Sequence, residues 1–135
     1  MLPRAFDHGS HDTLPTVAHG LAYVLVLFVL VIGIRFLGAP QAAARGYGVP
    51  AKPDGDAAHL TIKGLRDLTS GVIGLALLAF ADAHAAARFL LAVALTPLGD
   101  TVIVLRHGGS RAAAFGIHFA TAAVVLLSAA LLFAV

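Results

Sequence analysis

Four long apolar segments, separated by polar connections, dominate the pattern of this chain. They cover residues 17–38, 60–80, 85–105 and 112–135. Each has about the 20 residues that a helix needs to cross the hydrocarbon core of a bilayer. The pattern therefore predicts an all-α membrane protein, in which four transmembrane helices form one antiparallel bundle and one domain over residues 17–135.

Residues that stop and start helices stand at the borders of these segments. Pro40 follows Gly38 at the end of the first segment, a normal helix stop. Residues 41–45 are predicted to form one helical turn after Pro40. Three polar residues can cap the second, third and fourth helices in turn: Asp56, Asp82 and Ser110.

The polar leader, residues 1–16, precedes the first apolar segment, and we expect it to be flexible. That first segment has a second interpretation, as the apolar part of a cleaved signal peptide. The leader argues against this interpretation, because it is long, contains Asp7 and Asp12, and carries a single arginine.

Composition supports the membrane class and excludes several functions. Of the 135 residues, 59% are hydrophobic and 12% are charged, against roughly 45–50% and about 25% in a soluble domain. The net charge of +2 is too small for a nucleic-acid-binding protein. Because the chain has no cysteine, it has no disulfide, no thiol nucleophile and no thiolate metal site.

Lysine and arginine predict the orientation in the membrane. The leader and the second connection carry Arg4 and Arg88. The first and third connections, with the adjoining helix ends, carry the other seven basic residues: Arg35, Arg45, Lys52, Lys63, Arg66, Arg106 and Arg111. We therefore expect these two connections to be cytoplasmic and both termini to lie outside.

Charged residues inside the apolar segments are the strongest functional signal. At 1.5 Å per residue, four of them lie roughly 6–10 Å from the same membrane surface, each on a different helix: Arg35, Asp67, Asp100 and His118. Charges are expensive in hydrocarbon and usually face a bundle interior. We therefore expect one polar layer, in which an aspartate pairs with an arginine.

This layer suits acid–base chemistry on a small lipophilic molecule. A desolvated aspartic acid can donate a proton, an aspartate paired with an arginine stays ionised, and a histidine can relay protons. The catalytic candidates are Asp67, Asp100, His118 and Arg66, and the candidates for substrate binding are Arg35, Lys63, Ser70, Thr96 and Tyr47. The reaction types that fit are isomerisation, cyclisation and epoxide opening. We expect no metal and no cofactor.

Two other functions remain open on the sequence. The same pocket suits a ligand-binding or proton-coupled transport protein, and the polar layer could instead be a structural network of ion pairs in an accessory protein. If Asp67 and Asp100 pointed at lipid on opposite faces, with no cavity between the helices, the first two functions would fail and the third would stand. The expected partners are the lipid bilayer and a small lipophilic ligand; a homo-oligomer stays open.

Small residues on the second apolar segment predict close helix packing. Gly71 and Gly74 share the helix of Lys63 and Asp67, and glycines let helix backbones approach closely in a membrane. We therefore expect these two glycines at a helix–helix contact.

Several short motifs resemble one family. They are Gly33-x-Arg35-Phe36-x-x-x-Pro40, Tyr47-Gly48-Val49-Pro50, Lys63-Gly64-x-Arg66-Asp67-x-x-x-Gly71, Pro97-x-x-Asp100, Arg106-His107-Gly108, and then His118. In these positions the chain resembles the domain-of-unknown-function 4267 family over about residues 17–135. The resemblance implies a small four-helix membrane protein with a polar site and implies no particular activity.

Overall fold

The computed structural model describes residues 8–48, 52 and 55–135, and in this part of the chain all regular structure is helical. The helices are α1 (His8–Gly38), α2 (Pro40–Tyr47), α3 (Ala57–Phe80), α4 (Ala83–Val93), α5 (Leu95–Arg106), α6 (Arg111–Ala113) and α7 (Ala120–Phe133). A π-helical segment, η1 (Ala114–Phe119), joins α6 to α7. The all-α prediction is confirmed for the described residues.

Three helical stretches are long and apolar enough to cross a membrane: Asp12–Gly38, Ala83–Arg106 and Arg111–Phe133. They correspond to the first, third and fourth predicted spans, which supports the membrane-protein class. The remaining helix, α3, has 24 residues but carries Lys63, Arg66 and Asp67 in its first half. Its role as a fourth span, and with it the four-helix transmembrane bundle, stays a prediction.

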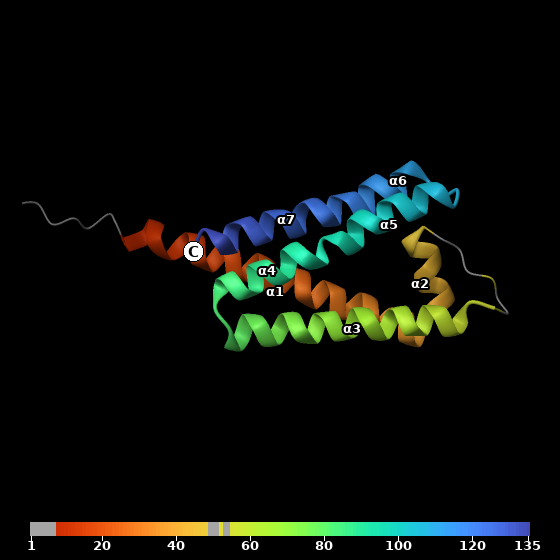
Figure 1. Ribbon diagram of the computed structural model, residues 1–135, viewed down its shortest axis with the longest axis horizontal. Coiled ribbons are helices and arrows are strands. Elements are labelled where there is room, and N and C mark those ends of the chain that lie inside the picture. Colours follow the sequence, from red (N-terminus) through yellow and green to blue (C-terminus); the bar gives the residue numbers. More distant parts are fainter. Residues whose placement is uncertain (1–7, 49–51, 53–54) are drawn as a thin grey trace, which may run out of the picture.

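The long helices run alongside one another, and α2 crosses one end of the molecule (Figure 1). Helix α3 contacts α1 along its length. Helices α4 and α5 follow one another in a direction opposite to α3, and α7 contacts both α1 and α4. Helix α2 contacts α1 and α3 and lies at the end where α5 meets α6. This end is the one that carries the polar residues.

Helix borders follow the sequence signals with two differences. The caps at Asp82 and Ser110 are confirmed, because their side-chain oxygens accept the backbone N–H of Ala85 and Ala113 at 2.8 and 3.0 Å. Asp56 stands at the cap position of α3 but makes no such bond, and it accepts the N–H of Lys52 instead. In addition, α1 begins at His8, so the second half of the predicted flexible leader is helical.

The contact between α1 and α3 is close because glycines line it on both sides. A Cβ atom on Gly33 would lie 2.6 Å from the backbone nitrogen of Leu68, and one on Gly64 would lie 2.9 Å from the carbonyl oxygen of Gly33. Gly71 and Gly74, further along α3, abut the side chains of Leu30 and Val26. The prediction that Gly71 and Gly74 lie at a helix contact is confirmed.

The helices that pass the polar end on the other side are irregular. The long helix from Ala83 to Arg106 is interrupted at Ala94, three residues before Pro97, whose ring nitrogen has no hydrogen to donate to the preceding turn. The last long helix contains the π-helical turn η1, which includes His118. Such π turns are rare and frequently mark functional sites.

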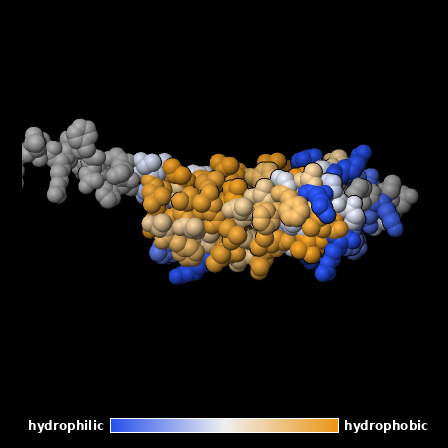
Figure 2. All heavy atoms as spheres, turned by 90° about the horizontal axis from the view of Figure 1, so that it is seen from above, coloured by the Kyte–Doolittle hydropathy of each residue, from blue (hydrophilic) through white to orange (hydrophobic). Residues whose placement is uncertain are grey.

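The outer surface is mostly apolar. Figure 2 shows a broad hydrophobic band, with hydrophilic side chains gathered mainly at one end. The large apolar side chains that are exposed include Val24, Leu27, Val31, Leu65, Leu91, Val102, Phe115 and Leu127. A band of this kind is unfavourable in water and suits the hydrocarbon core of a bilayer.

Candidate functional site

A cavity of about 240 Å³ lies between the helices, next to α2. Most of its lining is apolar, from α1, α4 and α7. Its polar lining residues are Arg35, Tyr47, Asp67, Ser70, Thr96, Asp100, His118 and Thr121. Seven of the nine residues that the sequence nominates for the site therefore line one cavity; the remaining two, Lys63 and Arg66, do not.

Asp100 and Tyr47 are joined across the cavity end, although 53 residues separate them in the chain. The phenol of Tyr47, the last residue of α2, donates a hydrogen bond to Oδ2 of Asp100 on α5. Burial raises the pKa of Tyr47 far above its usual value, and the charge of Asp100 and this hydrogen bond raise it further. The phenol therefore stays neutral and remains a hydrogen-bond donor.

Asp67 pairs with Lys63 rather than with an arginine. The ammonium of Lys63 lies 2.5 Å from Oδ2 of Asp67, one turn away on α3. It also lies 4.4 Å from the ring centroid of Phe36 and 4.3 Å from that of Tyr47, so two aromatic rings flank the cation. This cluster fixes the carboxyl group of Asp67 at the cavity wall.

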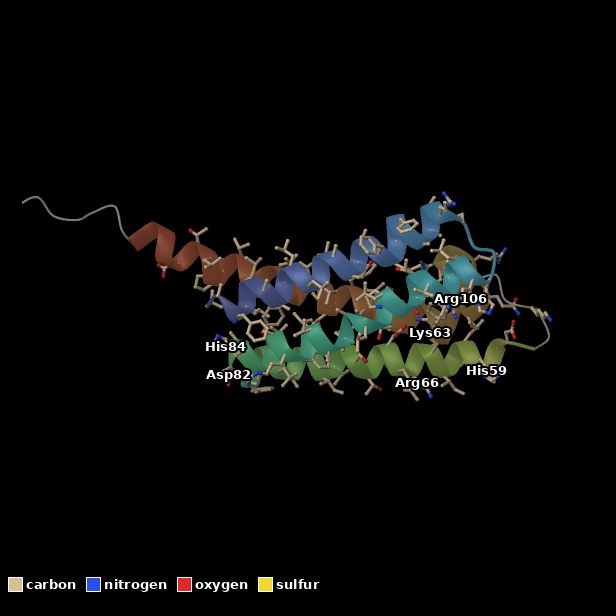
Figure 3. All side chains as sticks on the ribbon, turned by 45° about the horizontal axis from the view of Figure 1, so that its top comes forward. His59, Lys63, Arg66, Asp82, His84 and Arg106 are labelled. Atoms are coloured by element: carbon tan, nitrogen blue, oxygen red, sulfur yellow. The ribbon has the colours of Figure 1, made fainter. Side chains whose placement is uncertain are left out.

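Arg66 takes a different position from the one expected of it. Its side chain is exposed, and Figure 3 shows it on the outer side of α3, pointing away from the other helices. The cation that pairs with Asp67 is therefore Lys63, in the role that was expected of an arginine. Neighbouring residues on a helix point about 100° apart, which is why Arg66 and Asp67 cannot share a face.

His118 fixes the end of α2. Its side chain is 2% exposed, and its Nε2 lies 2.7 Å from the backbone carbonyl oxygen of Tyr47. A carbonyl oxygen only accepts hydrogen bonds, so Nε2 of His118 carries a proton and donates it. The imidazole and phenol rings also contact each other, with centroids 4.2 Å apart.

Two glycines allow α2 to close against the other helices. Gly48 ends α2 with φ +96°, a conformation that side chains rarely adopt, and a Cβ there would meet Ala113 at 2.9 Å. A Cβ on Gly109 would likewise lie 2.9 Å from the carbonyl oxygen of Gly48. This approach brings Tyr47 to Asp100 and His118, a convergence that helical periodicity alone does not show.

Comparison with known proteins yields one match. Neither the curated proteins nor the solved structures contain a significant relative of this chain. The model of one protein family, described as a domain of unknown function (DUF4267), matches residues 26–132. All the polar residues that line the cavity fall inside this range, which covers well over half of the chain. The chain therefore belongs to the DUF4267 family.

Proposed function

We propose that this protein binds a small lipophilic molecule within the membrane and catalyses proton transfer on it. The observation that carries the proposal is the cavity, whose walls are mostly apolar and which ends at Tyr47, Asp100 and His118. An apolar cavity with a few convergent polar groups is the usual form of a small-molecule site. Both Asp67 and Asp100 line this cavity, which supports a binding site over a purely structural network of ion pairs.

The two carboxyl groups stand in different surroundings, which suits two different roles. Asp67 is neutralised by the ammonium of Lys63. In the described residues, Asp100 faces no cation within ion-pair distance, and its hydrogen-bond partner is the phenol of Tyr47. Asp100 is therefore the group that exchanges a proton with the bound molecule, Tyr47 donates a hydrogen bond to it, and His118 positions Tyr47.

A comparison of lipid extracts tests this function. Isomerisation and cyclisation conserve mass, so cells that express the wild type should accumulate a lipophilic compound with the mass of its precursor but a different retention time. Asp100→Asn should abolish this product while the purified protein keeps its helicity and elution volume. Thr69→Val, an exposed position on α3 outside the cavity, is the matched control. If Asp100→Asn forms the product as fast as the wild type, the catalytic role is refuted.

Transport is the second candidate, and the irregular helices favour it. The interruption at Ala94 and the π turn at His118 lie on helices that line the cavity. Discontinuous helices are common at the substrate sites of transporters. Proteoliposomes containing the wild type would then exchange a labelled lipophilic compound in a proton-dependent manner, and Asp100→Asn would stop this exchange without any chemical change in the compound.

We also propose that α3 is a fourth membrane span. It is about 36 Å long at 1.5 Å per residue, and glycine contacts hold it against α1. Its charges are partly buried toward the other helices at Lys63 and Asp67, where the pair shields them from lipid.

Labelling of single cysteines tests this topology, because the chain has no cysteine of its own. With four spans, Gly55→Cys and His107→Cys lie on the same side of the membrane, and Ala81→Cys lies on the other. With three spans, in which α3 does not cross, Gly55→Cys and His107→Cys lie on opposite sides. The positive charge near the first and third connections supports a cytoplasmic location for them, and labelling of Gly55→Cys from outside would contradict that orientation.

A further inference from the structure

The cavity is elongated along the helix axes. On α1 its lining extends from Leu25 to Phe36, and on α4 and α5 it extends from Phe89 to Asp100. Each stretch corresponds to about 16 Å of helix at 1.5 Å per residue. An occupant that fills this space is therefore long and narrow rather than compact.

The polarity of the lining changes from one end to the other. Leu25, Leu90 and Val125 line the end that lies further from α2, whereas Tyr47 and Asp100 line the end beside it. A molecule that matches both ends has a hydrocarbon tail and one polar head. The tail would lie toward the middle of the predicted membrane and the head beside α2.

The hydrogen-bond donors near the head position are already used within the protein. The phenol of Tyr47 donates to Asp100, and Nε2 of His118 donates to the carbonyl oxygen of Tyr47. The ammonium of Lys63 donates one of its three hydrogens to Asp67, lies against the rings of Phe36 and Tyr47, and does not line the cavity. The hydroxyl of Thr121 donates to the carbonyl oxygen of Ile117. The atoms that remain for a ligand are mostly acceptors, above all the second oxygens of the two carboxylates.

Three other polar side chains line the cavity. The hydroxyls of Ser70 and Thr96 can donate or accept, so they do not discriminate between heads. Arg35 is a pure donor, but it stands exposed in the last turn of α1. The interior beside Asp100 is therefore rich in acceptors.

We propose that the ligand is a single-chain amphiphile whose head donates hydrogen bonds, a hydroxyl or an ammonium group, to Asp100. This inference rests on the proposed function and names the class of molecule that the same site takes. A carboxylate or phosphate head fits this position poorly, because it would bring a second negative charge against Asp100 and leave the acceptor oxygens unpaired.

Native mass spectrometry of the protein released from detergent tests the inference with four probes of equal chain length: dodecanol, dodecylamine, dodecanoate and methyl dodecanoate. Dodecanol and dodecylamine should bind at least about tenfold more tightly than the other two, which corresponds to one well-made hydrogen bond. Asp100→Asn removes the charge but keeps an acceptor oxygen. It should weaken the binding of dodecylamine and spare that of dodecanol, which separates a cationic head from a neutral one.

Two further variants keep this test separate from the test of the proposed function. Ser70→Phe fills the cavity and should abolish binding of every probe, whereas Thr69→Phe, exposed on the next position of α3, should bind like the wild type. If dodecanoate or its methyl ester binds the wild type as tightly as dodecanol and dodecylamine, the inference about the head is overturned while the pocket stands. If no probe binds the wild type more tightly than it binds the Ser70→Phe variant, the proposed function itself fails.

Discussion

The helices pack closely where α1 meets α3 and loosely where α5 and η1 pass the polar end. Where α1 meets α3, both helices are regular and glycines bring the backbones close, so that a single added Cβ at Gly33 or Gly64 would strike backbone atoms. Where α5 and η1 pass the polar end, the helices are interrupted or locally widened, and a cavity of about 240 Å³ remains between them and α1. We call the α1–α3 contact the close side of the molecule and the region of α5 and η1 around the cavity the open side.

This difference explains how charged groups persist in an apolar protein. The close α1–α3 contact fixes the position of α3, and therefore of the pair formed by Lys63 and Asp67. Irregular backbone on the other side lets Asp100 and His118 point at α2 rather than at lipid. Non-helical or irregular backbone at membrane depth is tolerated where it lines a cavity, which is the position it occupies here.

Substitution of the glycines in the α1–α3 contact should have the largest effect. Gly64→Leu must displace the backbone of α1, and overpacking of this kind costs about 3 kcal/mol or more where nothing can yield. Gly71→Leu should cost less, because its nearest neighbour is the end of the Leu30 side chain. Thermal unfolding in detergent measures both variants.

Gly20→Leu provides the matched control, since a Cβ at this position of α1 meets nothing within 4 Å. We expect its unfolding temperature to equal or exceed that of the wild type, because leucine favours a helix more than glycine does. Equal unfolding temperatures for Gly64→Leu and Gly20→Leu would show that the two helices are not held by close contact.

The sequence predicts the close side of the molecule better than the open side. Apolar segments, Pro40 and the caps at Asp82 and Ser110 determine where helices begin and end, and these are local signals. Gly71 was recognisable as a contact residue because small residues on a membrane helix have few other uses. Gly33 was not, because its partner Gly64 lies on another helix, and no pattern within α1 shows which face meets α3.

The sequence indicates most of the polar residues that line the cavity, but not which of them pair. Depth along each helix brings Asp67, Asp100 and His118 to one level, because every helix rises by the same amount per residue. The hydrogen bond between Tyr47 and Asp100 depends on how α2 folds back, which periodicity does not determine. The Lys63–Asp67 pair is consistent with a sequence signal, since residues four apart share a helix face.

On the close side, removal of Lys63 should destabilise the protein more than removal of Arg66. Lys63→Met leaves Asp67 without a cation at a position where its side chain is 18% exposed, and the loss of a hydrogen bond to a charged group costs about 1.5–3 kcal/mol. Arg66→Met, on the outer side of the same helix, should change stability by less than about 0.5 kcal/mol. Chemical unfolding of both variants in one detergent gives the comparison, and a larger loss for Arg66→Met would contradict the pairing.

Removal of the Tyr47 hydroxyl should have a smaller effect on the open side. Tyr47→Phe keeps the ring against His118 and Phe36 but leaves Asp100 without its donor, at a cost of about 1–2 kcal/mol. Tyr23→Phe, which removes the other tyrosine hydroxyl of the chain, serves as the control. A Tyr47→Phe protein as stable as Tyr23→Phe at pH 7 would mean that this hydrogen bond contributes no net stability.

The smallest effect should appear in alkaline solution and carries a definite sign. Burial, followed by the charge of Asp100, raises the pKa of Tyr47 in the folded protein above the usual value of 10.0. The unfolded chain therefore releases this proton first, so the contribution of the buried phenol is complete below pH 10 and declines as the pH rises further. The difference in unfolding temperature between the wild type and Tyr47→Phe should accordingly shrink between pH 9 and pH 11 and stay constant from pH 7 to pH 9. A difference that grows with pH would show that the folded protein holds Tyr47 as a phenolate, which would remove the donor on which the hydrogen bond to Asp100 depends.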